Sequence, residues 1–296
     1  MNPDRGIRTV TERAPAKINL TLHIVGRRAD GFHTLESLVT FSRGGDAVAL
    51  APGQPLALSV EGPTSAASGR VEDNLVLRAA RHFSDRFPGA KVGALHLVKR
   101  LPVAAGVGGG SSDAAAALRL LARANALSID DPRIMEAAKA SGADVSVCLA
   151  RRARMMRGIG DALGPLLAIP PIVALLVNPG VPVETKSVFA KMNIAPGTAT
   201  GFGRHPELYP RMQIEDLIAA LRKARNDLEA AACLLAPIIG DVLAVLSAAP
   251  GCRLARMSGS GATCFAIFPN CRSAARAKKA ILRAHPSWWV KICVLN

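Results

Sequence analysis

Hydrophobic and polar positions alternate strictly from residue 17 to residue 24, within an early segment of the chain, residues 14–25. Apolar side chains occupy the even positions from 18 to 24, and polar side chains occupy the odd ones. A period of two is typical of a half-buried β-strand. The pattern places Lys17 and Asn19 on one polar face, which for a lone strand indicates a solvated outer face of a sheet.

Apolar runs and turn signals predict the other elements. Strands are predicted at 33–41, 46–50, 56–60, 95–99, 172–177, 264–268 and 288–294. Helices are predicted near 75–83, from 111 or 112 to 126, and at 132–142, 185–192, 213–235 (broken at 226–228), 238–248 and 271–285. Strands and helices mix without a strict βαβ rhythm, so we expect an α+β fold. A proline-rich patch at 164–171 is the best linker candidate, which predicts domains at 1–166 and 167–296.

Capping signals sharpen three of these boundaries. Asn74 has the residue type of a helix N-cap, and Asp131 followed by Pro132 is a second helix start. Gly142 is suited to end that second helix. Asp144 comes two residues later at the mouth of an apolar segment, where it is either another cap or a catalytic acid.

A glycine-rich segment, Pro102 to Asp113, lies between a predicted strand and an alanine-rich helix. Glycine allows the backbone to turn with positive φ, and a helix start carries unpaired N–H groups and partial positive charge. Together these features predict an anion site, most simply a phosphate cradle. The segment has no Gly-Lys pair of a Walker A loop and lacks the last glycine of a dinucleotide fingerprint. A turn that binds nothing remains the alternative.

Composition limits the partners. The chain has 296 residues and a net charge of +15, which favours anionic partners. Aromatic residues make up only 4%, so a stacking platform for single-stranded RNA is poorly supplied, although an RNA-binding α+β protein stays a rival hypothesis. The six cysteines form no C-x-x-C pair and suggest reduced, core-filling thiols. Residues 1–9 carry no signal-like apolar segment and no run is long enough for a bilayer, so we expect a cytoplasmic protein that does not bind membranes or nucleic acid.

Three separated motifs resemble those of the GHMP kinases, a family of small-molecule kinases that includes galactokinase, homoserine kinase and mevalonate kinase. They are residues 14–20 (APAKINL), 102–115 and 258–261 (SGSG). Segments 29–35, 72–75, 142–145 and 226–228 further resemble a branch of that family whose substrate is an alcohol carried on cytidine diphosphate. Two positions depart from that pattern: Phe32 stands where tyrosine is frequent, and Ser146 stands where proline is usual.

The resemblance implies two α+β domains with the active site in the cleft between them, and ATP-dependent phosphorylation of a hydroxyl in non-mevalonate isoprenoid biosynthesis. It implies that Asp144 is the catalytic base and that Lys17, its partner near the transferred phosphoryl group, favours the ionised carboxylate. The ATP-binding residues it implies are Asn74 and Lys99 by the nucleoside, and Pro102, Val103, Ala104, Ala105, Gly106, Val107, Gly108, Gly109, Gly110, Ser111 and Ser112 around the phosphates. Mg²⁺ is expected on the phosphates, with Ser112 as the nearest hydroxyl. The cytidine diphosphate part would be held by Asn19, Phe32, His33, Thr185 and Phe189.

Two further expectations accompany this assignment. The chain is expected to be a monomer or a weak homodimer. The nearest rival enzyme is another GHMP kinase, acting on a sugar, homoserine or mevalonate, which would need no cytidine site.

Overall fold

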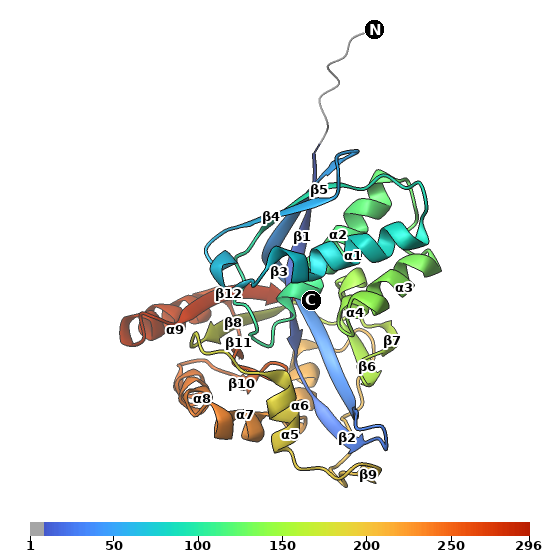
Figure 1. Ribbon diagram of the computed structural model, residues 1–296. Helices are drawn as coiled ribbons and strands as arrows, with labels where there is room; N and C mark the ends of the chain where they lie inside the picture. The colour runs from blue at the N-terminus through green and yellow to red at the C-terminus, as the bar shows by residue number, and fades with distance from the viewer. Residues whose placement is uncertain (1–8) are drawn as a thin grey trace. The chain divides into compact units, whose positions relative to one another are not determined.

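The computed structural model describes residues 9–296, which form two compact units (Figure 1). The first unit contains residues 9–16, Gly44–Val103 and Gly108–Arg151, and the second contains Lys17–Arg43, Ala104–Val107 and Arg152–Asn296. The segments interleave because strands β1 (Val10–Asn19) and β3 (His33–Pro52) each contribute residues to both units. The domain boundary after residue 166 stays a prediction, and the expectation about residues 1–9 lies outside the described residues except at Thr9.

The first unit combines a small sheet with a group of helices. Its strands are the first part of β1, the second part of β3, β4 (Ala57–Glu61) and β5 (Gly93–Val98). β1 pairs with β3, and β5 lies between β3 and β4, antiparallel to β3 and parallel to β4. The segments predicted at 46–50 and 56–60 are therefore strands, but they do not pair with each other across the turn at Pro52. Short 3₁₀ turns at Ser65–Ala67 and Val71–Asp73 follow β4.

The helices of the first unit pack around α2. They are α1 (Leu75–Arg86), α2 (Gly109–Ala124), α3 (Pro132–Ser141) and α4 (Val145–Ala150). Asn74 caps α1, Asp131 caps α3 with Pro132 in its first turn, and Gly142 follows the end of α3, as predicted. The side chains from Ser112 to Leu118 are buried, since alanine lets neighbouring helices approach α2 closely.

The start of α2 differs from the prediction. The helix begins at Gly109, two residues before Ser111, and its N-cap is Gly108 with φ +57°. Glycine costs about 1 kcal/mol relative to alanine inside a helix, which is why the sequence indicated a later start. Packing of the buried alanine face compensates for this local cost, so two glycines lie in the first turn.

The second unit contains most of the strands. One run of strands has the order β10 (Leu254–Met257), β11 (Cys264–Phe268), β8 (Ile172–Asn178) and β12 (Trp289–Leu295), each antiparallel to its neighbour. The first part of β3 pairs with β2 (His23–Arg27) and β6 (Arg154–Gly158), while β2 also pairs with β9 (Thr198–Ala199) and β6 with β7 (Ala162–Leu166). The helices are α5 (Thr185–Lys191), α6 (Ile214–Lys223), α7 (Glu229–Leu235), α8 (Ile238–Ala248) and α9 (Cys271–Ala284).

Two predictions in this unit were wrong in detail. The predicted strand at 14–25 is split into β1 and β2, because a break follows Asn19. The proline-rich linker candidate begins inside a strand: β7 ends at Leu166 and returns against β6. Two of the five residues of β6 are arginines, which obscure the alternation of apolar and polar side chains. The sequence therefore did not indicate a hairpin at this position. The mixture of elements confirms the α+β class.

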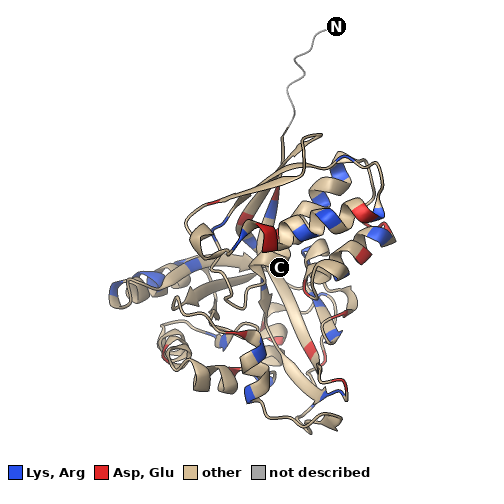
Figure 2. Ribbon diagram, viewed as in Figure 1, with Lys and Arg blue, Asp and Glu red and all other residues tan. Residues whose placement is uncertain are grey.

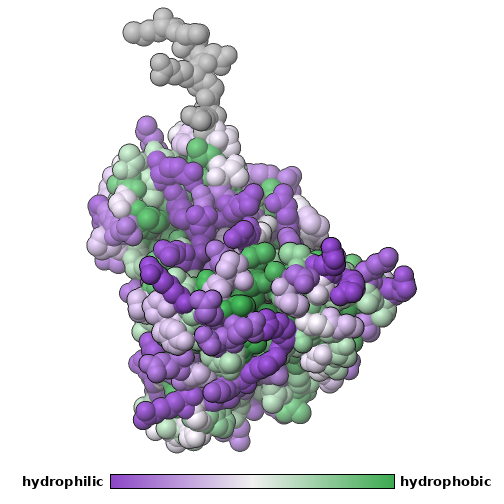
Figure 3. Space-filling model, turned by 180° about the vertical axis from the view of Figure 1, so that it is seen from behind, coloured by the Kyte–Doolittle hydropathy of each residue, from purple (hydrophilic) through white to green (hydrophobic). Residues whose placement is uncertain are grey.

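Lysine and arginine are spread over several elements, including α1, α3 and α9 (Figure 2). On the face drawn in Figure 3, hydrophilic residues cover most of the surface and hydrophobic residues form smaller patches. Within the described chain, no helix is both long and apolar enough to cross a bilayer. The six cysteines are free thiols, three of them buried.

A pair of histidines, buried His23 and half-buried His205, lies in the second unit. The rings of His23 and His205 have centroids 4.6 Å apart, and His23 Nε2 accepts the backbone N–H of Arg225 at 3.1 Å. Burial, followed by the charges of His205, Arg225 and Arg256, lowers the pKa of His23 to about 3. His23 is therefore neutral at neutral pH, with Nε2 as the acceptor.

We expect this histidine to make the fold sensitive to acid. The unfolded chain binds a proton near pH 6.5, but folded His23 does not until about pH 3, so stability is lost as pH falls through this window. The loss from one such group is at most about 1.4 kcal/mol per pH unit. Urea unfolding at pH 7.5 and 5 should show a smaller decrease for His23→Gln than for the unmodified chain. His96→Gln, at a half-exposed histidine on β5, is the control; equal decreases in both variants would contradict the assignment.

Candidate active site

Left-handed backbone conformations occur at every second residue along part of the glycine-rich segment. Ala104, Gly106 and Gly108 have φ values of +51°, +71° and +57°. Alternation of left-handed residues with their neighbours turns successive N–H groups toward one concave side, which is a typical anion-binding arrangement. Among the described residues, no protein acceptor takes the backbone N–H groups from Ala104 to Gly108. These donors remain available to a phosphate.

The carbonyl side of the same segment is held by the second unit. The carbonyls of Ala105 and Val107 accept the N–H groups of Thr263 and Lys17, at 3.1 and 2.8 Å. Ser258 Oγ donates to the carbonyl of Gly106 at 2.9 Å and accepts the Asn19 N–H at 3.1 Å. The three motifs identified in the sequence thus meet within one unit.

Close packing explains why glycine occupies position 106. A Cβ atom there would lie 2.3 Å from the Ser258 carbonyl oxygen. Any side chain would push the segment away from the third motif. The side chain of Asn226 in turn holds that motif, with Nδ2 donating to the carbonyls of Met257 and Gly259 at 2.8 and 2.9 Å.

A buried charge cluster supports the other end of the segment, within the first unit. Lys99 Nζ donates to Asp113 Oδ2 at 2.7 Å and to Asp46 Oδ2. Asp46 Oδ1 also accepts the backbone N–H groups of Arg100 and Leu101, at 2.5 and 2.8 Å. A Cβ at Gly109 would lie 3.4 Å from Lys99 Nζ. The cluster therefore ties the end of β5 to β3 and to the N-terminal part of α2.

Burial dominates the electrostatics of this cluster. It raises the pKa of Asp113 to about 7, with the charge of Lys99 opposing the rise and that of Asp46 adding to it. Burial alone would lower the pKa of Lys99, but the two carboxylates raise it. Asp113 Oδ1 is buried with no hydrogen-bond partner within the described chain. Lys99 was predicted to lie by a nucleoside; that contact stays a prediction, and its ammonium is already paired with two carboxylates.

Asp144 occupies the N-cap position of α4 in the first unit. Its side chain is half-buried and makes no capping hydrogen bond to the helix, unlike that of Asp131 at the start of α3. Ser146, which stands where the family has proline, lies in the first turn of α4 and donates to the Ala143 carbonyl at 3.2 Å. The first turn of a helix is a position that also accepts proline, so this departure from the family pattern lies where either residue fits a helical backbone.

Lys17 and Asn19 are buried, with 4% and 2% of their surface exposed. The expectation of a solvated outer face was therefore wrong for these two side chains. Asn19 Nδ2 donates to Ser37 Oγ at 2.7 Å, and Ser37 Oγ donates to the Thr21 carbonyl at 2.5 Å. This network fixes the orientation of the Asn19 amide next to the third motif. The catalytic role of Lys17 and the binding role of Asn19 stay predictions.

The predicted cytidine-binding residues lie in the second unit, and two of them, His33 and Phe189, are in ring contact with each other. The rings of His33 and Phe189 have centroids 4.9 Å apart, and Thr185 Oγ1 forms a 2.8 Å hydrogen bond with Ser260 Oγ. Phe32 is 59% exposed and makes no ring contact with another described aromatic residue. Burial, and then the charge of Arg27, lowers the pKa of His33, so its ring is neutral at pH 7. His33 Nε2 is buried without a hydrogen-bond partner in the described chain, and the binding role of His33 stays a prediction.

The site contains supporting residues that the sequence analysis missed. Asp46 and Asp113 belong to the charge cluster. Asn226 was identified as part of the 226–228 motif, but its role in holding the third motif was not. A single carboxylate in the alanine run that follows the glycine segment was the available signal for Asp113. Buried carboxylates are almost always paired, so that position implied a cationic partner.

Comparisons with known proteins identify the family. The model of the GHMP kinases N-terminal domain matches residues 74–152, and that of the GHMP kinases C-terminal domain matches residues 211–287. The chain belongs to the GHMP kinase family. The glycine segment, Ser112 and Asp144 all lie within the N-terminal match of this GHMP kinase, and Asn226 and the third motif lie within the C-terminal match.

Individual relatives carry more specific names than the family. The chain is 57% identical to the 4-diphosphocytidyl-2-C-methyl-D-erythritol kinase of Xanthobacter autotrophicus, over 96% of this chain and 98% of that one. It is 56% identical to the protein of the same name from Methylobacterium radiotolerans, over 95% and 97%. A crystal structure of 4-(cytidine 5'-diphospho)-2C-methyl-D-erythritol kinase matches with a TM-score of 0.76 and 31% identity, over 97% of this chain and 99% of that one. A homoserine kinase from Cytophaga hutchinsonii, 19% identical with a TM-score of 0.67, shares the fold.

Proposed function

We propose that this GHMP kinase transfers the γ-phosphoryl group of ATP to the 2-hydroxyl of 4-diphosphocytidyl-2-C-methyl-D-erythritol, giving the 2-phosphate and ADP. The reaction belongs to the non-mevalonate pathway of isoprenoid precursors. The observation that carries the assignment is 57% identity along 96% of the chain to a kinase of that name. The family and the relatives together support a kinase over an RNA-binding protein.

The geometry of each unit is consistent with phosphoryl transfer. Such a reaction depends on positioning and charge neutralisation more than on covalent chemistry by the protein. The N–H groups from Ala104 to Gly108 and the start of α2 offer donors for phosphate oxygens. We assign ATP binding to Asn74 and to the segment from Pro102 to Ser112. The Lys99 cluster stabilises the end of that segment.

The chemical step needs an acceptor for the hydroxyl proton. We assign this role to the Asp144 carboxylate, which can take the proton as the O–P bond forms, and we place Lys17 by the transferred group. Both assignments follow from the position of these residues in the family motifs.

Mg²⁺ forms part of the proposal. Among the described residues, no group of three or more His, Cys, Asp or Glu side chains could hold a metal ion. This fits Mg²⁺ held mainly by phosphate oxygens with one or two protein contacts, as is usual for ATP sites. We assign the Ser112 hydroxyl as the protein oxygen that binds Mg²⁺. In the structure this hydroxyl donates a hydrogen bond to Cys148 Sγ at 3.5 Å. When bound, Mg²⁺ would neutralise charge on the phosphates.

The His33 and Phe189 pair should select the cytidine carrier. Stacking of a base on an aromatic ring is worth about 1–3 kcal/mol, so Phe189→Ala should raise KM for the cytidine substrate about 5- to 150-fold. KM for ATP should stay within about twofold, a change of about 0.4 kcal/mol or less. Tyr209→Ala, at a 53% exposed aromatic residue of the same unit, is the matched control. Equal effects of the two substitutions on the cytidine substrate would remove Phe189 from the site.

Product analysis tests which hydroxyl is phosphorylated. Phosphorus NMR of the isolated product, with proton coupling resolved, distinguishes a phosphate on the tertiary 2-oxygen, which has no proton on its carbon, from one on the 3-oxygen. We expect no three-bond proton coupling to the new phosphate. A coupled signal would contradict the 2-hydroxyl assignment while leaving the kinase assignment intact. A cytoplasmic location and a monomeric or weakly dimeric state complete the proposal.

A further inference from the structure

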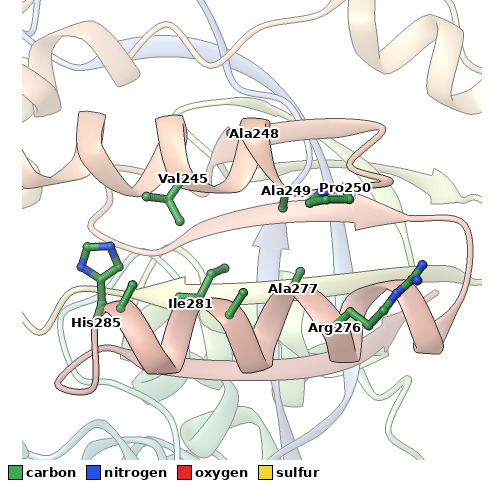
Figure 4. Close-up of a pocket in the computed structure, with 10 residues that line it drawn as sticks. Val245, Ala248, Ala249, Pro250, Arg276, Ala277, Ile281 and His285 are labelled. Atoms are coloured by element: carbon green, nitrogen blue, oxygen red, sulfur yellow. The ribbon is translucent and has the colours of Figure 1, made fainter.

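An apolar groove lies between α8 and α9 in the second unit (Figure 4). Its volume is about 560 Å³, within the range of small-molecule sites. The walls are aliphatic: Val245 comes from α8, while Ala277 and Ile281 come from α9, with the Ile281 side chain pointing toward α8. His285 lies at one end and Arg276 toward the other. No motif of the kinase family assignment falls in this groove.

A stripe of cations runs along α9 next to the groove. Arg272, Arg276, Lys279 and Arg283 follow one another at spacings of four, three and four residues, which places them on one face of a helix. All four are exposed, and α9 contains no acidic residue. Within the described chain, no carboxylate forms an ion pair with Arg276. The groove therefore combines an apolar floor with one guanidinium, that of Arg276, which belongs to a row of cations on the adjacent face of α9.

We propose that this groove binds a soluble amphiphile with a short alkyl chain and a phosphate head group, with the head on Arg276. The alkyl chain lies along Ala277 and Ile281 toward His285. A guanidinium binds two phosphate oxygens at once, and the neighbouring cations of the stripe match a head group that carries more than one negative charge.

Other occupants fit the charge pattern less well. A second copy of the chain in a symmetric dimer would place one cationic stripe against the other, and like charges across an interface repel. A membrane surface would contact the exposed cations, but it would not fill a recess bounded by two helices. A phosphate-headed single molecule satisfies both the groove and the stripe.

The tryptophan fluorescence of the chain can report binding in this groove. Its two tryptophans are adjacent, at 288 and 289, and the His285 ring stacks on Trp288 with centroids 3.9 Å apart and planes 7° apart. Decyl phosphate, titrated below its micellar concentration, should change tryptophan emission in a saturable manner. Decanol lacks the phosphate head group and methyl phosphate lacks the alkyl chain, so each should bind more weakly than decyl phosphate.

Variants locate the site. Hydrogen bonds to charged groups contribute about 1.5–3 kcal/mol, so Arg276→Gln should raise Kd for decyl phosphate by about 10-fold or more. Ala280→Phe should abolish binding by filling the groove. Arg283→Gln, in the same stripe but outside the groove lining, should change Kd less than threefold. All three variants should keep ATP-dependent turnover and the same circular dichroism spectrum, since none lies in the assigned kinase site.

Four results would overturn the proposal: no saturable binding, equal loss in Arg276→Gln and Arg283→Gln, binding to phosphatidylglycerol vesicles with none to the monomeric probe, or a dimer in sedimentation that Ala280→Phe dissociates. The last two would assign the groove to a membrane or to self-association. None of them bears on the kinase reaction, so the two proposals can fail separately.

Discussion

Asp144→Asn is expected to lower kcat by a factor on the order of 10²–10⁴, the usual contribution of a general base. Asparagine has nearly the same shape as aspartate but cannot accept the proton of the substrate hydroxyl. The KM values for ATP and the cytidine substrate should therefore change only a few-fold, about 1 kcal/mol or less. Steady-state ADP release with each substrate varied in turn measures all three quantities.

Asp131 supplies a matched control in the same unit. It caps α3, since its side chain accepts the Arg133 N–H at 2.9 Å, whereas the Asp144 side chain makes no capping bond to α4. Asp131→Ala should cost about 0.5–2 kcal/mol of stability and leave kcat unchanged. Asp144→Ala should cost less stability and most of the activity. A near-normal kcat in either Asp144 variant would remove this residue from the mechanism.

Lys99→Met is expected to destabilise the protein by about 3–5 kcal/mol, the usual effect of removing one partner of a buried ion pair. Asp46 and Asp113, with 0% and 2% of their side chains exposed, would then lie close together without a cation. Urea unfolding at pH 7.5 without nucleotide measures the loss. A stability close to that of the unmodified chain, with only KM for ATP raised, would instead favour the predicted contact of Lys99 with the nucleoside.

A double variant tests the cause of that loss. Asp113→Asn should cost less than Lys99→Met, because Lys99 keeps Asp46 as a partner. Adding Asp113→Asn to Lys99→Met removes one of the two facing carboxylates, so the double variant should be more stable than Lys99→Met alone. Additive losses would show that the three side chains do not act as a cluster.

The features of the site that depend on local backbone conformation could be predicted from the sequence. The glycine segment, the caps at Asn74 and Asp131 and the end of α3 at Gly142 were predicted because each depends on residue types within a few positions. The apolar segments predicted most strands and helices for the same reason. The structure then showed that Asn19, Gly106 and Ser258, from three distant motifs, are in contact.

The remaining features depend on tertiary contacts that no local pattern encodes. Asp46 lies 53 positions from Lys99 in the chain, and only the pairing of β3 with β5 brings them together. The burial of Lys17 and Asn19 reverses the expectation from alternation, because the polar face of β1 is covered by other segments. The β6–β7 hairpin was missed because arginines and glycines obscure its period.

The most direct test of the kinase assignment is a coupled ADP-release assay with 4-diphosphocytidyl-2-C-methyl-D-erythritol, compared with mevalonate, homoserine and galactose under identical conditions. We expect turnover with the cytidine substrate that depends on ATP and is lost in Asp144→Asn, and none above background with the other three. Turnover of one of those three, without turnover of the cytidine substrate, would contradict the assignment.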